Sequence, residues 1–191
     1  DLDLLVGSGG VLSHAPRREQ SAKMLIDAFM PEGITQLAVD SIFMMPQLGV
    51  LAHVAKEEFS KDARKAALEV FHKDCLIRLG TCITPMGKAK PGEIILNAVL
   101  TLADGTIKEQ ELKSGEILRL EVPYEPVKAI LKPSKNMNIG GGKGQEIQAN
   151  IFGGTVGLIF DGRDRPITIP VNQEKRLESI RSWSDALNEY P

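Results

Sequence analysis

A glycine-rich turn near the start of the chain has the residues best suited to approach a ligand closely. The turn reads Gly7-Ser8-Gly9-Gly10 and follows a short apolar run, Leu2–Val6, that predicts a buried strand. Glycines here let the backbone pass close to a planar ligand and let the next helix begin against the sheet. His14 lies beside the turn, where its ring could approach a nucleotide base, cap a helix or face solvent.

The phosphate-binding loops of common nucleotide-binding folds are absent. Leu12 stands where the Rossmann pattern requires its third glycine. The second glycine cluster, Gly140–Gly144, lacks both the earlier glycine and the Ser or Thr that a Walker A loop has after its lysine. This cluster predicts a flexible connection between strands, and contact of its basic, amide-rich loop with an anion or a partner remains the alternative.

The sequence contains no clear pattern of a metal site or a catalytic site. His72, Cys75 and Cys82 have no fourth ligand at zinc-like spacing, so we predict that the two cysteines are buried as small hydrophobic residues. No serine has a recognisable His and Asp support, and no nucleophile elbow occurs. We therefore predict no metal ligand and no catalytic residue in this chain.

A run of charged residues late in the chain, Asp161–Arg165, predicts a tight turn with solvent-exposed charged residues at its edge. Asp161-Gly162 is typical of a tight hairpin. Arg163 and Arg165 are predicted to be solvated and to pair at the surface with Asp161 and Asp164.

Composition describes an ordinary globular protein. The 191 residues are 42% hydrophobic and 25% charged, with a net charge of −2. This charge gives no reason to expect nucleic acid as a partner, and no apolar run is long enough to cross a bilayer. Two cysteines make no disulfide framework, which favours the cytoplasm. The chain begins at Asp1 and enters a strand at once, so we expect that a larger N-terminal part has been removed.

The sequence divides into three segments that differ in composition, residues 1–74, 75–172 and 173–191. We predict an α+β fold. In the first, Leu37–Val39 predicts a strand, and Asp40 is placed to cap a helix with its apolar stretch at Ile42–Val54. The second predicts a β-rich barrel or sandwich. Its strand candidates are Cys75–Leu79, Ile94–Leu102, Thr106–Leu112, Ile117–Val122, Val127–Leu131, Glu146–Phe152, Thr155–Phe160 and Pro166–Pro170.

Two local signals in the later segments are strong. Asp104-Gly105 predicts a type I′ hairpin turn, because glycine and aspartate tolerate the positive φ angles that it needs. The last segment predicts an amphipathic helix over Gln173–Tyr190 that packs back onto a domain. Its apolar face would be Leu177, Ile180, Trp183 and Leu187.

The glycine turn together with the Asp40 helix resembles the end of the nucleotide-binding domain of the sugar kinase, heat-shock chaperone and actin superfamily. In that superfamily a strand that ends in a Gly-Gly turn meets the adenosine, and a following strand leads to an Asp-initiated helix with small residues. The matching positions are Gly9, Gly10 and Pro16 in the first element and Asp40, Gly49 and Ala52 in the second. The alternative is an arbitrary strand–helix–strand–helix unit.

A second resemblance covers nearly the whole chain. Val6–His14, Phe43–Ala52, Phe152–Pro166 and the Trp-containing terminal helix resemble the C-terminal part of the glutamate mutase accessory (L) protein family. The most specific part is Gly153-Gly154-Thr155-Val156-Gly157-Leu158, followed by Asp161–Pro166. The resemblance implies the end of an actin-like (ribonuclease H-like) ATPase subdomain, in an accessory protein that protects or reactivates an adenosylcobalamin-dependent mutase.

The resemblance implies that ATP or ADP with magnesium binds the whole accessory protein, while this chain supplies only the adenosine side and is inactive alone. The implied nucleotide-binding residues are Gly7, Ser8, Gly9, Gly10 and His14. The implied partner is the mutase, met through the β-rich segment. A non-enzymatic protein-binding module without a nucleotide site is the alternative function. A small-molecule kinase is a third, although no acceptor-activating carboxylate stands in a recognisable setting.

Overall fold

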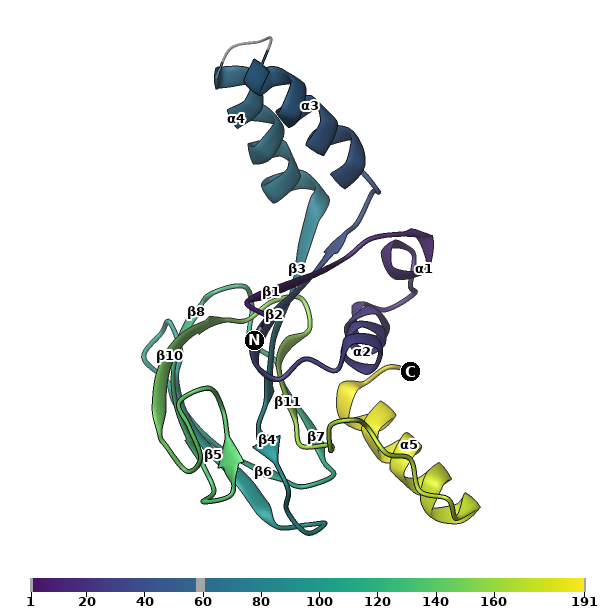
Figure 1. The fold of residues 1–191 in the computed structure, drawn as a ribbon, viewed down its shortest axis with the longest axis vertical. Helices are drawn as coiled ribbons and strands as arrows, with labels where there is room; N and C mark the ends of the chain where they lie inside the picture. The colour runs from purple at the N-terminus through teal and green to yellow at the C-terminus, as the bar shows by residue number, and fades with distance from the viewer. Residues whose placement is uncertain (1, 58–60, 191) are drawn as a thin grey trace.

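The fold, a computed structural model, contains five α-helices and three β-sheets over the described residues, 2–57 and 61–190 (Figure 1). The expectation that an N-terminal part has been removed rests on Asp1, which lies outside the described residues. The helices are α1 Gly10–Ser13, α2 Arg18–Phe29, α3 Met45–Glu57, α4 Lys61–Val70 and α5 Gln173–Leu187, with a π-helix at Phe71–Cys75 after α4. The predicted α+β class and the terminal helix are confirmed.

The larger sheet combines strands from distant parts of the chain. Its order is β1-β2-β3-β11-β7, with β1 parallel to β2, β3 parallel to β11, and the other two pairs antiparallel. The strands are β1 Leu4–Gly7, β2 Gly33–Asp40, β3 Leu76–Thr84, β7 Ile117–Leu120 and β11 Gly157–Asp161. Because β2 pairs with β3, this sheet runs across the predicted boundary between residues 74 and 75.

The second sheet is antiparallel, with the order β10-β8-β5-β6. Its strands are β5 Ile94–Thr101, β6 Ile107–Lys113, β8 Pro126–Pro133 and β10 Ile147–Phe152, and a two-stranded ribbon joins β4 Met86–Gly87 to β9 Met137–Asn138. The predicted hairpin between β5 and β6 forms, but its turn is not of type I′, because Gly105 has a positive φ (85°) and Asp104 does not; Asp104 Oδ1 instead accepts a hydrogen bond of 2.8 Å from the Thr106 N–H.

Two apolar cores define three layers. The first core lies between the sheets, where Ile83 of β3 and Phe160 of β11 pack with the inward residues of the four-stranded sheet. The second lies on the other face of the larger sheet, where Leu25 of α2 and Trp183 of α5 pack. The helices α3 and α4 form a hairpin that stands away from these layers (Figure 1). No helix among the described residues has the length and apolar character of a membrane span.

Two predicted elements are wrong and one is partly so. Asp161-Gly162 ends β11 without a hairpin, and 166–170 is not a strand. The helix α5 forms as predicted, but only Trp183 and Leu187 of its apolar face are buried. Leu177 and Ile180 remain 46% and 40% exposed, because the sheet lies only beneath the last turns of the helix.

Candidate functional site

The glycine turn lies at the end of β1, between that strand and the short α1. Gly9 has a φ of 116°, a conformation that favours glycine. A Cβ at Gly9 or Gly10 would meet no atom within 4 Å, so the outer side of the turn is open. A Cβ at Gly7 would instead lie 2.7 Å from Leu12 Cδ1, so this glycine lets α1 pack against the strand.

Asp40, which is fully buried at the end of β2, joins the glycine turn to α3. Its Oδ2 accepts hydrogen bonds from Ser8 Oγ at 3.2 Å and from the Met45 N–H at 2.8 Å, and its Oδ1 accepts one from the Met44 N–H at 3.1 Å. Its backbone oxygen accepts a 2.6 Å bond from Ser13 Oγ. The Asp40 carboxylate thus binds the N–H groups at the start of α3, as predicted, although this helix begins at Met45 and not directly after Asp40; the same carboxylate also holds the turn.

The predicted nucleotide-binding residues differ in exposure: Gly7 is buried, Ser8 and Gly9 are half-buried, and Gly10 and His14 are exposed. Ser8 is tied inward to Asp40, while Gly10 is exposed. His14 is exposed and closes α1, because its backbone N–H donates to the Gly10 oxygen at 2.9 Å. The roles of Ser8 and Ser13 could not be found from the sequence, since both depend on a strand that lies 27 or more residues away.

Exposed apolar side chains occur in α1 and on the connection from β2 to α3. Val11 is 76% exposed at the start of α1, and Ile42 and Phe43, two and three residues after Asp40, are each more than half exposed. Such residues are normally withdrawn from water. The turn thus offers an open backbone surface with apolar side chains on both neighbouring connections.

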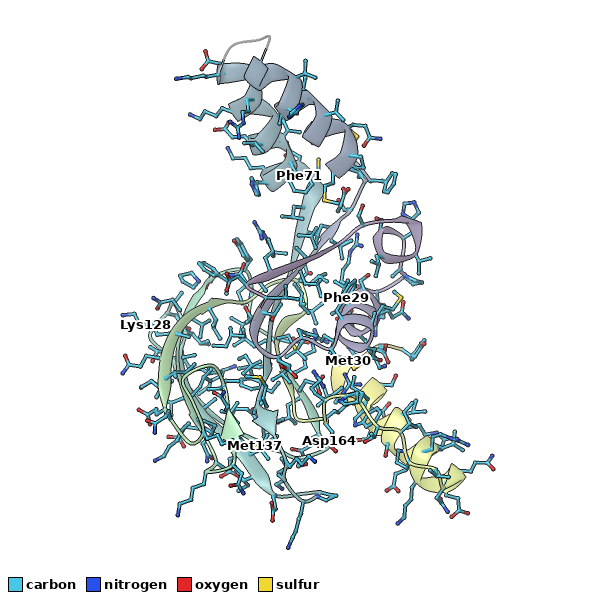
Figure 2. The ribbon with its side chains drawn as sticks, in the orientation of Figure 1. Phe29, Met30, Phe71, Lys128, Met137 and Asp164 are labelled. Atoms are coloured by element: carbon cyan, nitrogen blue, oxygen red, sulfur yellow. The ribbon has the colours of Figure 1, made fainter. Side chains whose placement is uncertain are left out.

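A second polar cluster follows β11, and it corrects the prediction of a solvated rim. Asp161 is fully buried and Arg163 is 4% exposed. Arg163 binds this carboxylate with two side-chain bonds, Nε to Oδ1 at 2.9 Å and Nη2 to Oδ2 at 2.8 Å, and Arg165 Nη2 adds a bond to Oδ2 at 2.9 Å. Among the four charged residues predicted to pair at the surface, only Asp164 is exposed. It lies on the connection between β11 and α5 and is labelled in Figure 2.

The cluster connects β11 to both helices of the helical layer. Arg163 Nη2 lies 2.8 Å from Asp27 Oδ1 of α2, an ion-pair contact in which that oxygen accepts no hydrogen bond. Asp27 also pairs with Lys23 one turn earlier. The Arg163 guanidinium lies over the Trp183 ring of α5, 5.0 Å from its centroid. These contacts are typical of a structural network, because each charge is used inside the protein.

Opposing effects set the pKa of Asp161. Burial raises the pKa, but the hydrogen bonds and charges of Arg163 and Arg165 outweigh burial and lower it below its ordinary value. The nearby Cys82 thiol has its pKa raised to about 12 by burial, with the negative charge of Asp161 adding to the effect. Cys75 and Cys82 are buried free thiols, which confirms their predicted place in the core.

The glycine stretch before β11 lies where three backbones cross. A Cβ at Gly153 would lie 2.1 Å from the Pro123 oxygen, and one at Gly154 would lie 2.4 Å from the backbone carbon of Leu79. A Cβ at Gly157 would lie 2.2 Å from the Leu120 oxygen. The most specific part of the sequence resemblance is therefore explained by close packing rather than by ligand chemistry.

The remaining candidates do not form a site. No group of three or more His, Cys, Asp or Glu that could hold a metal ion occurs within residues 2–57 and 61–190. The glycine cluster at 140–144 connects β9 to β10, and Asn138 Oδ1 orders it by accepting hydrogen bonds of 2.8 Å from the N–H groups of Gly140 and Gly142.

Comparison with known proteins gives a family match over part of the chain. Residues 1–74 match the family model described as MutL protein. This segment contains β1, the glycine turn, Asp40 and the α3–α4 hairpin, and the match confirms the family resemblance over residues 1–74. No curated protein and no solved structure matches the chain.

Proposed function

Residues 1–74 match the MutL protein family, and from this premise we propose that the chain is part of an ATP-binding accessory protein for an adenosylcobalamin-dependent mutase such as glutamate mutase. The Gly7–Gly10 turn contributes the adenosine side of the nucleotide site. Other parts of the accessory protein hold the phosphates and magnesium, so this chain alone does not hydrolyse ATP. The protein acts in the cytoplasm, where its free thiols stay reduced.

The open backbone of the glycine turn is the observation that carries this proposal. An added Cβ at Gly9 or Gly10 would have no atom within 4 Å. The lack of a side chain at these positions therefore leaves room for a flat ring to approach the backbone. Ile42 and Phe43 offer exposed apolar groups on the neighbouring connection. An adenine ring has the two properties that fit this surface, a flat apolar face and hydrogen-bonding edges.

Asp40 gives bound nucleotide a route to the rest of the protein. Its carboxylate holds Ser8 of the turn and the first N–H groups of α3 at the same time. A ligand that prefers one position of the turn therefore biases the start of α3, which is how a ligand shifts a conformational equilibrium. The hairpin of α3 and α4 extends that change away from the sheets (Figure 1). The proposal includes that residues 1–74 form the end of an actin-like ATPase subdomain.

A Gly10→Leu variant is expected to weaken adenosine nucleotide binding without unfolding the protein. An added Cβ meets no atom within 4 Å, so the larger side chain extends from the exposed turn into the space where the ligand would lie. Titration of the ¹⁵N-labelled chain with ADP and magnesium should shift the amide signals of Gly9 and Gly10, and the variant should reduce the affinity about tenfold or more.

The matched control is Gly49→Leu, because Gly49 is also exposed and also has no atom within 4 Å of an added Cβ. This variant should bind as the unchanged chain does. Equal weakening by both variants, or nucleotide-induced shifts confined to residues outside the turn, would contradict the proposed site.

A non-enzymatic protein-binding module is the second candidate function. The α3–α4 hairpin presents exposed apolar side chains, namely Val50, Leu51, Leu68 and Val70, in the part of the fold that stands away from the sheets (Figure 1). A surface of this kind is typical of contact with another protein. If nucleotide leaves every amide signal unchanged, in this chain and in the whole accessory protein, the module is the better account.

A further inference from the structure

A groove of about 780 Å³ separates α5 from β7, far along the chain from the glycine turn. Its lining comes from one face of α5 and from the beginning of the strand. The helix contributes Glu174, Leu177, Glu178, Arg181, Ser182, Asp185 and Ala186, and the strand side contributes Glu116, Ile117 and Leu118. Leu177 is 46% exposed here, so the apolar floor is not covered by the protein itself.

The groove runs beside the edge strand of the larger sheet. In the sheet order of the described residues, β7 is the last strand. The Glu116 oxygen accepts a 2.8 Å hydrogen bond from Gly162, so the backbone of Glu116 faces β11, and by alternation that of Leu118 does too. The backbone groups of Ile117 and Arg119 therefore point to the opposite edge. An edge of this kind can pair with an added strand.

The charges around the groove are mostly negative. Glu116, Glu174, Glu178 and Asp185 carry four carboxylates, and Arg181 carries the single positive charge of the lining. The surplus of three negative charges surrounds an apolar floor. Such a lining attracts basic side chains and repels acidic ones.

We propose that this groove binds an extended segment of a partner protein in which apolar and basic residues alternate. The segment adds a strand to β7, its apolar side chains cover Leu177, and its basic side chains meet the carboxylates of α5. Backbone hydrogen bonds at a sheet edge provide affinity in this mode, and alternate side chains provide specificity. A second copy of this chain is a poorer occupant, because a two-fold contact would place two acidic rims against each other.

A fluorescein-labelled peptide of alternating valine and lysine, long enough to pair with the whole of β7, is the probe. Fluorescence anisotropy with the full chain should show binding that weakens as salt is raised, because the charges that attract the peptide are screened. A peptide of alternating valine and glutamate should bind at least about tenfold more weakly. Methylation of alternate backbone amides of the lysine peptide should reduce its affinity by a similar factor, since strand addition needs those N–H groups.

The variant Glu174→Lys with Glu178→Lys should lower the affinity for the lysine peptide about tenfold. Its matched control, Glu109→Lys with Glu111→Lys, makes the same change in net charge at exposed residues of β6 and should leave the affinity unchanged. The proposal is wrong if both double variants bind alike, if the methylated peptide binds as tightly as the unmethylated one, or if the lysine peptide does not bind. It is also overturned if sedimentation shows a dimer that Leu177→Asp dissociates, because the occupant is then a second copy.

Discussion

An Asp161→Ala variant is expected to lose about 3–5 kcal/mol of free energy of unfolding, the usual cost of removing one partner from a buried ion pair. The loss arises because Arg163 and Arg165 both bind this carboxylate inside the protein. Without it, Arg163 keeps the ion pair with Asp27 and the contact with the Trp183 ring, but loses its two hydrogen bonds to a buried carboxylate. Denaturant unfolding followed by the fluorescence of Trp183, the single tryptophan, measures the effect directly, because Arg163 lies over its ring.

Asp164→Ala is the matched control, since this carboxylate lies three residues later and is exposed. Its effect should stay within about 0.5 kcal/mol. Should Asp161→Ala leave the protein unfolded, Asp161→Asn keeps the shape of the side chain and provides a measurable intermediate loss. Equal stability of the Asp161 and Asp164 variants would show that the buried network contributes nothing.

The same carboxylate makes stability depend on pH. Its folded pKa is lowered, so its contribution is fully present above the unfolded value of about 3.9 and is lost as the pH falls through the folded pKa. We expect the free energy of unfolding to decrease below about pH 4. In Asp161→Asn this acid-dependent loss should be smaller, as measured by the midpoint of denaturant unfolding across pH. An unchanged profile would assign the acid sensitivity to other carboxylates.

A Gly154→Ala variant is expected to lose about 3 kcal/mol, the upper part of the usual range for overpacking. The added Cβ would lie 2.4 Å from the backbone carbon of Leu79 and 2.5 Å from the backbone nitrogen of Gly80. These atoms belong to β3 in the middle of the larger sheet, so the strain cannot be relieved by turning a side chain. Thermal and denaturant unfolding would measure the loss.

Gly49→Ala is the control for this variant. Gly49 lies in α3 with no atom within 4 Å of an added Cβ. Alanine also favours a helix more than glycine does, so the control should gain about 0.5–1 kcal/mol. If Gly154→Ala were as stable as the unchanged chain, the close crossing of backbones would not limit this position.

Local chemistry made several elements predictable from the sequence. Asp104-Gly105 identified the position of the hairpin turn, because Gly105 supplies a positive φ there, although the turn is not of the predicted type I′. Asp40 was recognised as a cap for a similar reason, since the N–H groups that it accepts lie four and five residues later. At the candidate site, the sequence predicted the glycine turn but not its bond from Ser8 to Asp40.

The features that sequence reasoning missed depend on distant contacts. Arg163 was predicted to be solvated because its neighbours are charged, yet Asp27, from a helix more than a hundred residues earlier, contacts it in the interior. No close packing was predicted for Gly154, because the strand that it crosses begins at Leu76, far back in the chain. The burial of α5 likewise depends on β7 and β11, which the helix pattern alone cannot specify.

The order of strands in the larger sheet has a consequence for synthesis on the ribosome. The segment 1–74 emerges before the rest of the larger sheet, but β2 pairs with β3, and β3 pairs in turn with β11, whose last residue is Asp161. The nascent chain therefore waits for more than eighty further residues before this sheet can close, and contacts of such long range slow folding. During that interval the unfilled edge of β3 is open to other chains, so we expect the yield of folded protein to depend on chaperones that bind unpaired strands.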